Sequence, residues 1–342
     1  MLFLELAWPF RNQNLDREEM MRRLLGRIAA FTVGIVLAAG PQVAVAAYPD
    51  KPVTIILGSA PGGSNDLTIR VVATRLSEMW GQPVLVVNRP SDSNILAMQL
   101  VAQAPADGYT ILSANNNFTI TPSQMKLTYD PIKSFAPITL LAILPMILVA
   151  HPTTPVKSFK DFMAYVKSKP GQLNFGAAGV GDPGGLSMRL LLHKTGMDMV
   201  EVRFRGGARV FQAVRGNEIP ITFTSVSNAL PYVQDGTLTA IAVSTKSRSP
   251  QLPDVPTIAE VAGLPGFDVP QWQGALVPAA TPKDIQKKLH TDFVAALKSP
   301  VVQDVFKKQG ITAIANTPDE FASFIKTEIP QWAELLKNNP KQ

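Results

Sequence analysis

Cysteine is absent from this chain of 342 residues. Without cysteine the protein forms no disulfide bond and holds no structural metal site built on thiolates. An exported protein of this composition also lacks the cysteine through which a lipoprotein is acylated and tethered. If the chain is exported, we therefore expect a free protein and not a lipid-anchored one.

Histidine is scarce, and the common catalytic motifs are missing. The three histidines, His151, His193 and His290, lie far apart in the sequence. The chain contains no G-x-S-x-G nucleophile turn, no G-x-x-x-x-G-K-[ST] phosphate loop and no H-E-x-x-H zinc motif. These absences favour a binding protein over an enzyme, with no catalytic residue, cofactor or metal expected.

Charge of one sign never gathers into a block. Lysine and arginine number 32 against 26 aspartates and glutamates, a formal net charge of +6 spread along the chain. Nucleic-acid-binding proteins concentrate their basic residues in a patch or stripe, which this sequence does not do. We therefore expect no nucleic-acid partner.

The first 47 residues have the pattern of an export signal. Arg22, Arg23 and Arg27 precede the apolar run 28–39, and Ala44-Val45-Ala46 forms a small-x-small cleavage site. This arrangement is typical of a secretory signal peptide, here cleaved near Ala46 or Ala47, with translation starting at Met20 or Met21. The alternative is an uncleaved anchor, because residues 28–47 are just long enough to span a bilayer. Gly40, Pro41 and the alanine-rich exit favour cleavage and a periplasmic protein.

The chain from Tyr48 onward is too long for a single hydrophobic core, which predicts two lobes. Strand-like and helix-like segments alternate, which predicts an α/β fold with mostly parallel sheets flanked by helices. The pattern also predicts a serine-capped helix over 158–168, helices over 226–234 and near 258–262, an apolar run over 138–150, and a final helix that opens on the capping box Thr317-Pro318-Asp319-Glu320. The strand Met146 to Ala150 is a candidate crossing between the lobes, and Gly274 to Val277 is the expected return strand. The predicted organisation is an N-terminal extension and signal peptide (1–47), a first lobe (48–147 and 275–342) and a second lobe (148–274).

Two glycine-rich turns each join a strand to a helix. The first follows the strand 53–57 and consists of Pro61, Gly62, Gly63, Ser64, Asn65 and Asp66. Such a turn aims unpaired backbone N–H groups and the positive end of a helix dipole at one point. An ordinary strand-to-helix turn is the alternative for this turn taken alone. A second matching turn favours a shared site for one small anionic molecule.

The second turn follows the strand 173–176 and includes Gly179, Gly181 and Asp182. Asp182-Pro183 reads as an N-cap followed by proline at the first helical position. An aspartate cap accepts from the same N–H groups that an anionic ligand would use, and its charge repels a carboxylate. This end of the site is therefore expected to be only partly open to anions, or to accept a less charged end of the ligand.

Polar residues follow other predicted strands at the edge where open α/β sheets bind ligands. Asn115 and Asn116 follow the strand 109–113, and Thr224 and Ser225 follow the strand 219–223. A simple turn cluster is the alternative for both pairs. Arg205, which follows the strand 200–204, is a candidate to pair with a ligand carboxylate, and a solvated arginine is its alternative.

The chain from Tyr48 to about residue 336 resembles the periplasmic solute receptors of tripartite tricarboxylate transporters, also called Bug proteins. The segments that carry the resemblance occur in order along the chain: Tyr48-Pro49-Asp50-Lys51-Pro52-Val53, Ala60-Pro61-Gly62-Gly63 with Asp66, Gly81-Gln82-Pro83-Val84, Asn88-Arg89-Pro90, Asp107-Gly108-Tyr109-Thr110, Phe135-Ala136-Pro137, Lys169-Pro170-Gly171-Gln172-Leu173-Asn174, Ala178-Gly179-Val180-Gly181 and Leu252-Pro253-Asp254-Val255-Pro256-Thr257. Each segment is modest alone, and their number and order make the resemblance specific.

The resemblance implies a two-lobe flytrap fold with crossing strands as the hinge. It implies a monomeric receptor that captures a small organic acid between the lobes and delivers it to the large and small membrane subunits of a carrier. In the family the first glycine-rich turn holds the ligand carboxylate and the second lobe meets the far end. Two further functions stay open: a ligand-sensing module for a membrane signalling system, and an exported enzyme on this scaffold.

The chain departs from the family pattern at its polar positions. Asp182 stands where the family usually has serine, and Gly185 where it has a nearby histidine. Asn115 and Asn116 replace threonine or serine, and Thr224 replaces an aspartate. The changed set argues against a citrate-like ligand and leaves a monocarboxylate, an aromatic acid and an amide-bearing acid open.

Overall fold

The computed structural model describes residues 20–22, 48–178 and 182–337. Residues Met1–Ala47 and Tyr48–Gln342 form separate units. The predicted cleavage site and apolar run lie outside the described residues. Within the described part of the chain, no helix combines the length and apolar character that crossing a bilayer requires.

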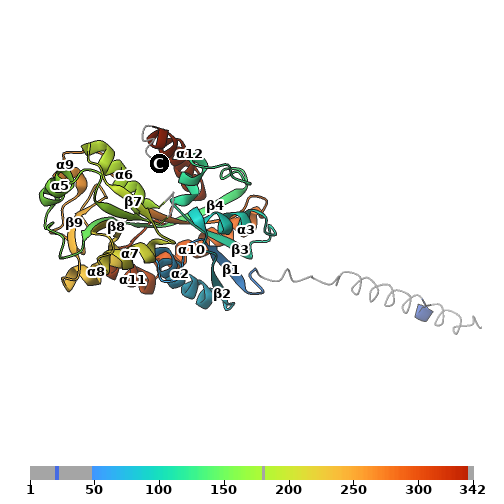
Figure 1. The fold of residues 1–342 in the computed structure, drawn as a ribbon. Coiled ribbons are helices and arrows are strands. Elements are labelled where there is room, and N and C mark those ends of the chain that lie inside the picture. The colour runs from blue at the N-terminus through green and yellow to red at the C-terminus, as the bar shows by residue number, and fades with distance from the viewer. Residues whose placement is uncertain (1–19, 23–47, 179–181, 338–342) are drawn as a thin grey trace, which may run out of the picture. The chain divides into compact units, whose positions relative to one another are not determined.

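The first of two sheets has six strands in the order β11-β4-β10-β3-β1-β2 (Figure 1). Its strands are β1 (Val53–Leu57), β2 (Val84–Asn88), β3 (Thr110–Asn115), β4 (Phe135–Leu144), β10 (Gln271–Pro278) and β11 (Thr312–Ala313). The helices of this half are α2 (Ser64–Trp80), α3 (Ile95–Ala102), α4 (Asn117–Ile120), α10 (Lys283–Lys298), α11 (Pro300–Lys308) and α12 (Pro318–Lys337). Short 3₁₀ turns cover Asp92–Asn94 and Thr121–Ser123.

The second sheet has five strands in the order β7-β6-β8-β5-β9. They are β5 (Met146–Ala150), β6 (Asn174–Ala177), β7 (Val200–Arg203), β8 (Ile221–Ser225) and β9 (Thr239–Val243). Its helices are α5 (Phe159–Ser168), α6 (Pro183–Thr195), α7 (Gly207–Arg215), α8 (Val226–Gln234) and α9 (Ile258–Ala262). Two sheets flanked by helices confirm the predicted α/β class.

Each sheet has a majority of strands that run in one direction and a minority that run against them. Three neighbouring strands are parallel in each sheet, β2-β1-β3 and β7-β6-β8. β10 is antiparallel to β3 and β4, and β5 is antiparallel to β8 and β9. β11 is also antiparallel to β4. β5 and β10 enter their sheets from the other half of the molecule, so their direction is not set by a local strand–helix–strand unit.

Proline stands at both places where the chain changes sheet. Pro145 separates β4 of the first sheet from β5 of the second. Pro270 follows Val269, which packs in the core of the second sheet, and precedes β10 of the first. We propose that Pro145 and Pro270 mark the crossings between the lobes.

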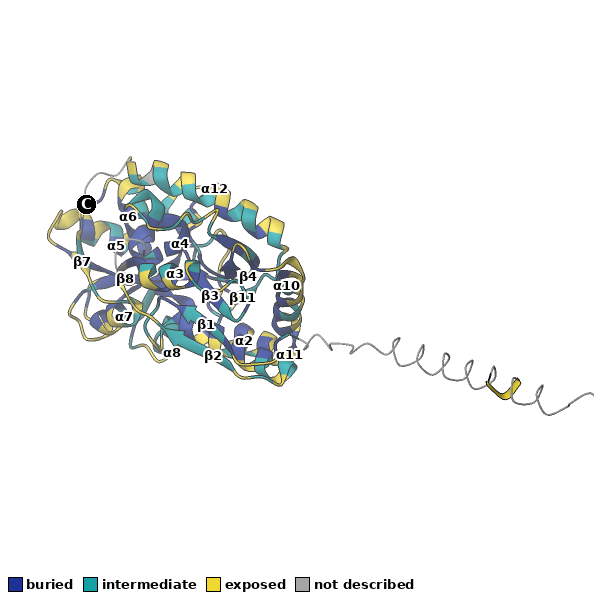
Figure 2. Ribbon diagram, turned by 90° about the vertical axis from the view of Figure 1, so that its right-hand side faces the viewer, coloured by how far each residue is buried: buried dark blue, intermediate teal, exposed yellow. Residues whose placement is uncertain are grey.

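Apolar clusters cover both faces of each sheet, and the strands are largely buried (Figure 2). Leu289 and Phe293 of α10 and Phe306 of α11 share one cluster with Val53 and Ile55 of β1. The C-terminal segment therefore packs on the first sheet, although it follows the whole second half in sequence. α12 contacts both halves, with Phe321 in a first-sheet cluster and Trp332 against a second-sheet cluster.

Several helix starts carry the caps that the sequence indicates. Ser158 caps α5 through a hydrogen bond from the Asp161 N–H group. At the start of α12, Thr317 Oγ1 accepts from the Glu320 N–H group and the Glu320 carboxylate accepts from the Thr317 N–H group, which confirms the predicted capping box.

Candidate ligand-binding site

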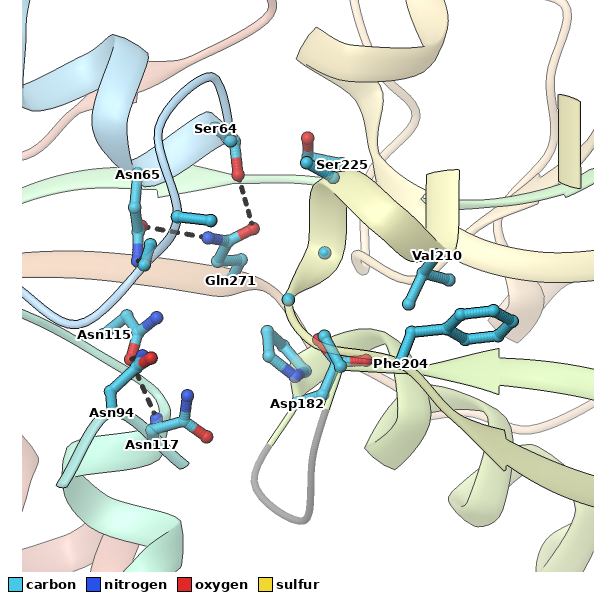
Figure 3. Close-up of a pocket in the computed structure, with 18 of the residues that line it drawn as sticks. Ser64, Asn65, Asn94, Asn115, Asn117, Asp182, Phe204, Val210, Ser225 and Gln271 are labelled. Atoms are coloured by element: carbon cyan, nitrogen blue, oxygen red, sulfur yellow. Dashed lines mark hydrogen bonds between the residues drawn. The ribbon is translucent and has the colours of Figure 1, made fainter. Parts of the chain in front are cut away.

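A cavity of about 760 Å³ lies between residues of the first sheet and residues of the second (Figure 3). Its volume is in the range of small-molecule sites in proteins. The lining from the first half comprises Gly58, Ser59, Ala60, Gly63, Ser64, Asn65, Pro90, Ser91, Asn94, Asn115, Asn117 and Gln271. The lining from the second half comprises Met146, Ala178, Asp182, Pro183, Arg203, Phe204, Arg205, Gly206, Gly207, Ala208, Val210, Phe223, Thr224, Ser225 and Asn228.

The N-terminus of α2 is one wall of this cavity. Gly63 is the N-cap residue of this 17-residue helix, and no side chain caps it. The N–H groups of the first helical residues have no acceptor within the helix, so they remain available to a ligand. Because the helix dipole adds partial positive charge at this end, the wall favours a carboxylate.

Gln271 fixes the side chains of the α2 start. Its Oε1 accepts from Ser64 Oγ at 3.2 Å, and its Nε2 donates to Asn65 Oδ1 at 3.0 Å (Figure 3). Asn65 Nδ2 in turn donates to Ser59 Oγ at 3.1 Å. The strand that enters from the second half thus holds Ser64 and Asn65 in place at the cavity wall.

Asp66 holds the turn and does not line the cavity. Its carboxylate accepts from the Gly62 N–H group at 3.0 Å, from Arg70 Nε at 3.0 Å and from Asn88 Nδ2 at 2.9 Å. Burial raises the pKa of Asp66, but the hydrogen bonds from Arg70, Gly62 and Asn88 outweigh burial and leave the pKa below its ordinary value. Asp66 is therefore charged and already fully engaged with the protein.

The N-terminus of α6 is capped by the side chain of Asp182. Asp182 Oδ2 accepts from the Gly185 N–H group at 2.8 Å, as the sequence predicts for an aspartate N-cap. Asp182 is half-buried and lines the cavity. Burial raises the pKa of Asp182, and hydrogen bonds from backbone N–H groups with the charge of Arg189 offset only part of that effect.

α7 supplies an uncapped helix start that the sequence reading missed. Gly206 is its N-cap residue with φ of +95°, and no side chain caps the helix. A Cβ atom on Gly206 would lie 3.6 Å from Ala60 Cβ of the first glycine-rich turn. The turn before α2 and the turn before α7 therefore approach each other. The signal in the sequence is the pair Gly206-Gly207 directly after a strand, flanked by Arg205 and Arg209.

The two arginines of the lining differ in their partners. Arg203 Nε lies 3.1 Å from Glu201 Oε1, so its charge is paired. Arg205 is exposed, and within the described part of the chain its guanidinium forms no ion pair. Arg205 is thus a cation at the cavity that is free to attract an anion.

Asparagines form the wall beside β3. Asn115 Oδ1 accepts from Asn94 Nδ2 and from the Asn117 N–H group, both at 3.2 Å. Asn116 is outside the lining and holds the start of β10 instead, since its Nδ2 donates to the Pro270 carbonyl at 3.1 Å and its Oδ1 accepts from the Trp272 N–H group at 2.9 Å.

The structure brings many of the predicted residues to the cavity. Thr224 and Ser225 lie at its second-sheet side, where Ser225 Oγ also accepts from the Asn228 N–H group at 3.3 Å and caps α8. The predicted residues that line the cavity are Gly63, Ser64, Asn65, Asn115, Asp182, Arg205, Thr224 and Ser225. Pro61, Gly62, Asp66 and Asn116 are outside the lining, and Gly179 and Gly181 are outside the described residues. Ligand contact by any of them stays a prediction.

Comparison with known proteins agrees with the two-sheet α/β fold described above. Residues 68–340 match the family described as tripartite tricarboxylate transporter family receptor. This chain belongs to that family. The match covers most of the chain: it includes the second sheet and the first sheet except β1, and it leaves out the cavity residues that precede residue 68.

Three solved structures illustrate the likeness. The periplasmic binding protein BugD is 31% identical with a TM-score of 0.82, over 86% of this chain and 99% of that one. A protein from Rhodopseudomonas palustris with adipate is 29% identical with a TM-score of 0.82, over 86% and 98%. MatC from Rhodopseudomonas palustris with bound malate is 30% identical with a TM-score of 0.80, over 84% and 100%. The chain therefore shares the two-lobe fold of periplasmic solute receptors that bind small carboxylates.

Proposed function

We propose that this protein is a periplasmic receptor that captures a small carboxylated organic molecule in the cavity between its sheets. One observation carries the proposal: the uncapped start of α2 opens onto a cavity that both halves line. The neighbouring free cation Arg205 gives the cavity further attraction for an anion. Malate and adipate, the ligands of two similar structures, are carboxylates of a size that this cavity holds.

The proposed physiological role is delivery to a tripartite membrane carrier. The chain would be exported by its N-terminal signal, cleaved near Ala46 or Ala47, and would act as a monomer. The large and small membrane subunits of the carrier are its proposed partners. Family membership supports this role, as does the connection of the two sheets at Pro145 and Pro270, about which the lobes would close on a ligand.

The binding proposal is tested at Gly63. A Cβ atom there meets only the Ala60 carbonyl oxygen within 4 Å, at 3.6 Å, so the Gly63→Val protein is expected to fold. Its side chain would occupy space at the open start of α2. Calorimetry with malate, adipate and any acid that native mass spectrometry finds in the purified protein should show binding to the parent and at least about a hundredfold weaker binding to the variant.

Ser158→Val is the matched control, because it also puts valine at a helix N-cap but lies outside the cavity. It should lower stability by about 1 kcal/mol and leave affinity unchanged. Parent-like affinity of Gly63→Val would contradict a carboxylate site at α2. Turnover of a bound acid by the purified protein would instead favour an enzyme.

A further inference from the structure

Asn117 has a buried side-chain amide whose oxygen lacks a partner among the described residues. The residue is 5% exposed, and its Oδ1 forms no hydrogen bond to the part of the chain that the structure describes. Its backbone N–H group donates to Asn115 Oδ1 at 3.2 Å, which fixes the start of α4. The side-chain amide of Asn117 takes no part in that contact. A buried polar group without a partner destabilises a protein by about 1–3 kcal/mol, so such a group calls for an explanation.

The amide of Asn117 faces the cavity. Asn117 is one of the lining residues, and Figure 3 shows its side chain extending from the side of Asn94 and Asn115 toward the side where Asp182 lies. The side-chain oxygens of its neighbours Asn115 and Asn116 already accept hydrogen bonds from N–H groups of the protein. Asn117 alone of these three therefore offers both an amide donor and an amide acceptor to a guest.

Asp182 adds a second acceptor to the same cavity. It is the one carboxylate among the described residues that line the cavity. Its Oδ2 accepts from the Gly185 N–H group, and because a carboxylate has about four acceptor positions, Asp182 can still accept a hydrogen bond from a guest. The carboxylate occupies the α6 start, where an anion would otherwise bind, and like charges in a site of low solvation repel.

The complement of these two side chains is an uncharged group with two N–H donors and one acceptor. A primary carboxamide has this pattern: one N–H and the oxygen match the Asn117 amide, and the second N–H matches the Asp182 carboxylate. A carboxylate has acceptors only and would face both the Asp182 charge and the Asn117 oxygen.

We propose that the cavity selects a carboxylic acid whose far end is a carboxamide, over the dicarboxylic acid of the same length. The inference rests on the proposed function, since it assigns the acid group to α2 and the amide to Asn117 and Asp182. Arg205 is the competing element, because a free guanidinium would favour a second carboxylate.

The first test compares matched pairs of probes: succinate with succinamate, glutarate with glutaramate, and adipate with adipamate. Calorimetry at pH 7.5 should give the parent protein at least about a tenfold preference for the monoamide in the pair that binds best. Asp182→Asn keeps a good N-cap and removes the charge, so this preference should fall to about threefold or less. Asp304→Asn, which makes the same charge change on exposed α11, should keep the preference of the parent.

The second test uses Asn117→Leu, which removes the amide at similar volume. Because the amide has no protein partner, the melting temperature should stay the same or rise, whereas monoamide binding should weaken by at least about tenfold. A fall in melting temperature with unchanged monoamide affinity would assign Asn117 a structural role and overturn the inference.

The outcomes also separate this inference from the proposed function. A parent that prefers the dicarboxylate, with binding lost in Gly63→Val, would overturn the amide assignment and leave the carboxylate receptor intact. Loss of that dicarboxylate binding in Arg205→Gln would identify Arg205 as the residue that recognises the second acid group. Failure of every probe to bind would overturn the proposed ligand class.

Discussion

The indole N–H group of Trp272 donates to the carboxylate of Glu328 at 2.8 Å. Trp272 belongs to β10, directly after the cavity residue Gln271, and Glu328 belongs to α12. Thr119 of α4 donates to the same carboxylate at 2.6 Å. A single half-buried acid thus connects the C-terminal helix to the strand that orients the α2 start.

Glu328→Gln should change how stability depends on pH. Burial raises the pKa of Glu328 above its ordinary value of 4.5, and the hydrogen bonds from Thr119 and Trp272 offset only part of this. The folded state therefore binds the proton more tightly than the unfolded state, so stability falls as pH rises from 4.5 toward the folded pKa. Glutamine keeps an acceptor without the charge and should add about 1 kcal/mol at pH 7, with a flatter profile in urea denaturation between pH 4 and 8. A difference in the free energy of unfolding between variant and parent that is the same at every pH would contradict this account.

Asp66→Asn should have the opposite pH signature. The folded pKa of Asp66 lies below its ordinary value of 3.8, so its contribution is present above that value and is lost as pH falls through the folded pKa. Because Arg70 is 46% exposed, we expect a loss of only about 1–2 kcal/mol at pH 7, measured by urea denaturation. The difference from the parent should shrink at pH 3. An undiminished difference there would show that the carboxylate charge is not the cause.

Asn116→Ala should weaken both stability and ligand binding. The substitution leaves the Pro270 carbonyl and the Trp272 N–H group without the amide that now pairs with them, which should cost about 1–3 kcal/mol. Gln271 lies between these residues and holds Ser64 and Asn65, so affinity should fall although Asn116 does not line the cavity. Thermal denaturation and calorimetry on the same sample would check both effects, and unchanged affinity in a destabilised protein would limit Asn116 to a structural role.

Gly274→Ala should destabilise the first half of the protein strongly. A Cβ atom at this position in β10 would lie 2.2 Å from Phe321 Cζ, well inside contact distance, and the Phe321 ring is fully buried. Displacing a buried ring should cost about 1–3 kcal/mol or more in urea denaturation. Gly207→Ala is the control, because no atom lies within 4 Å of its Cβ position, and it should change stability by less than about 1 kcal/mol.

Elements with local signals could be predicted from the sequence. α8 and α9 have the bounds that the sequence indicated, 226–234 and 258–262, and the Thr317–Glu320 capping box lies where its pattern placed it. β11 and α4 were missed because they are only 2 and 4 residues long, too short for a periodic pattern. The start of β4 at Phe135 was missed too, since the prediction took only the continuous apolar run that begins at Ile138.

The candidate site was predictable only in part. The glycines and polar residues after strands pointed to one edge of each sheet, which is where the cavity lies. The partner of Asn65 and Ser64, Gln271, is separated from them by 206 and 207 residues, and no local pattern connects such positions. Asp66 was expected at the ligand because it belongs to the glycine-rich turn, yet its charge is used within the protein by Arg70.

Prolines 145 and 270 have a consequence for mechanics. Neither residue has an N–H group, so neither can donate a backbone hydrogen bond to a neighbouring strand, although the Pro145 carbonyl accepts from the Val226 N–H group. The described strands on either side of these prolines belong to two separate sheets. If the halves close on a ligand as proposed, we expect the bend at these two residues, next to Met146 and Gln271 of the cavity wall, so a guest held by both halves would lie beside the axis of closure.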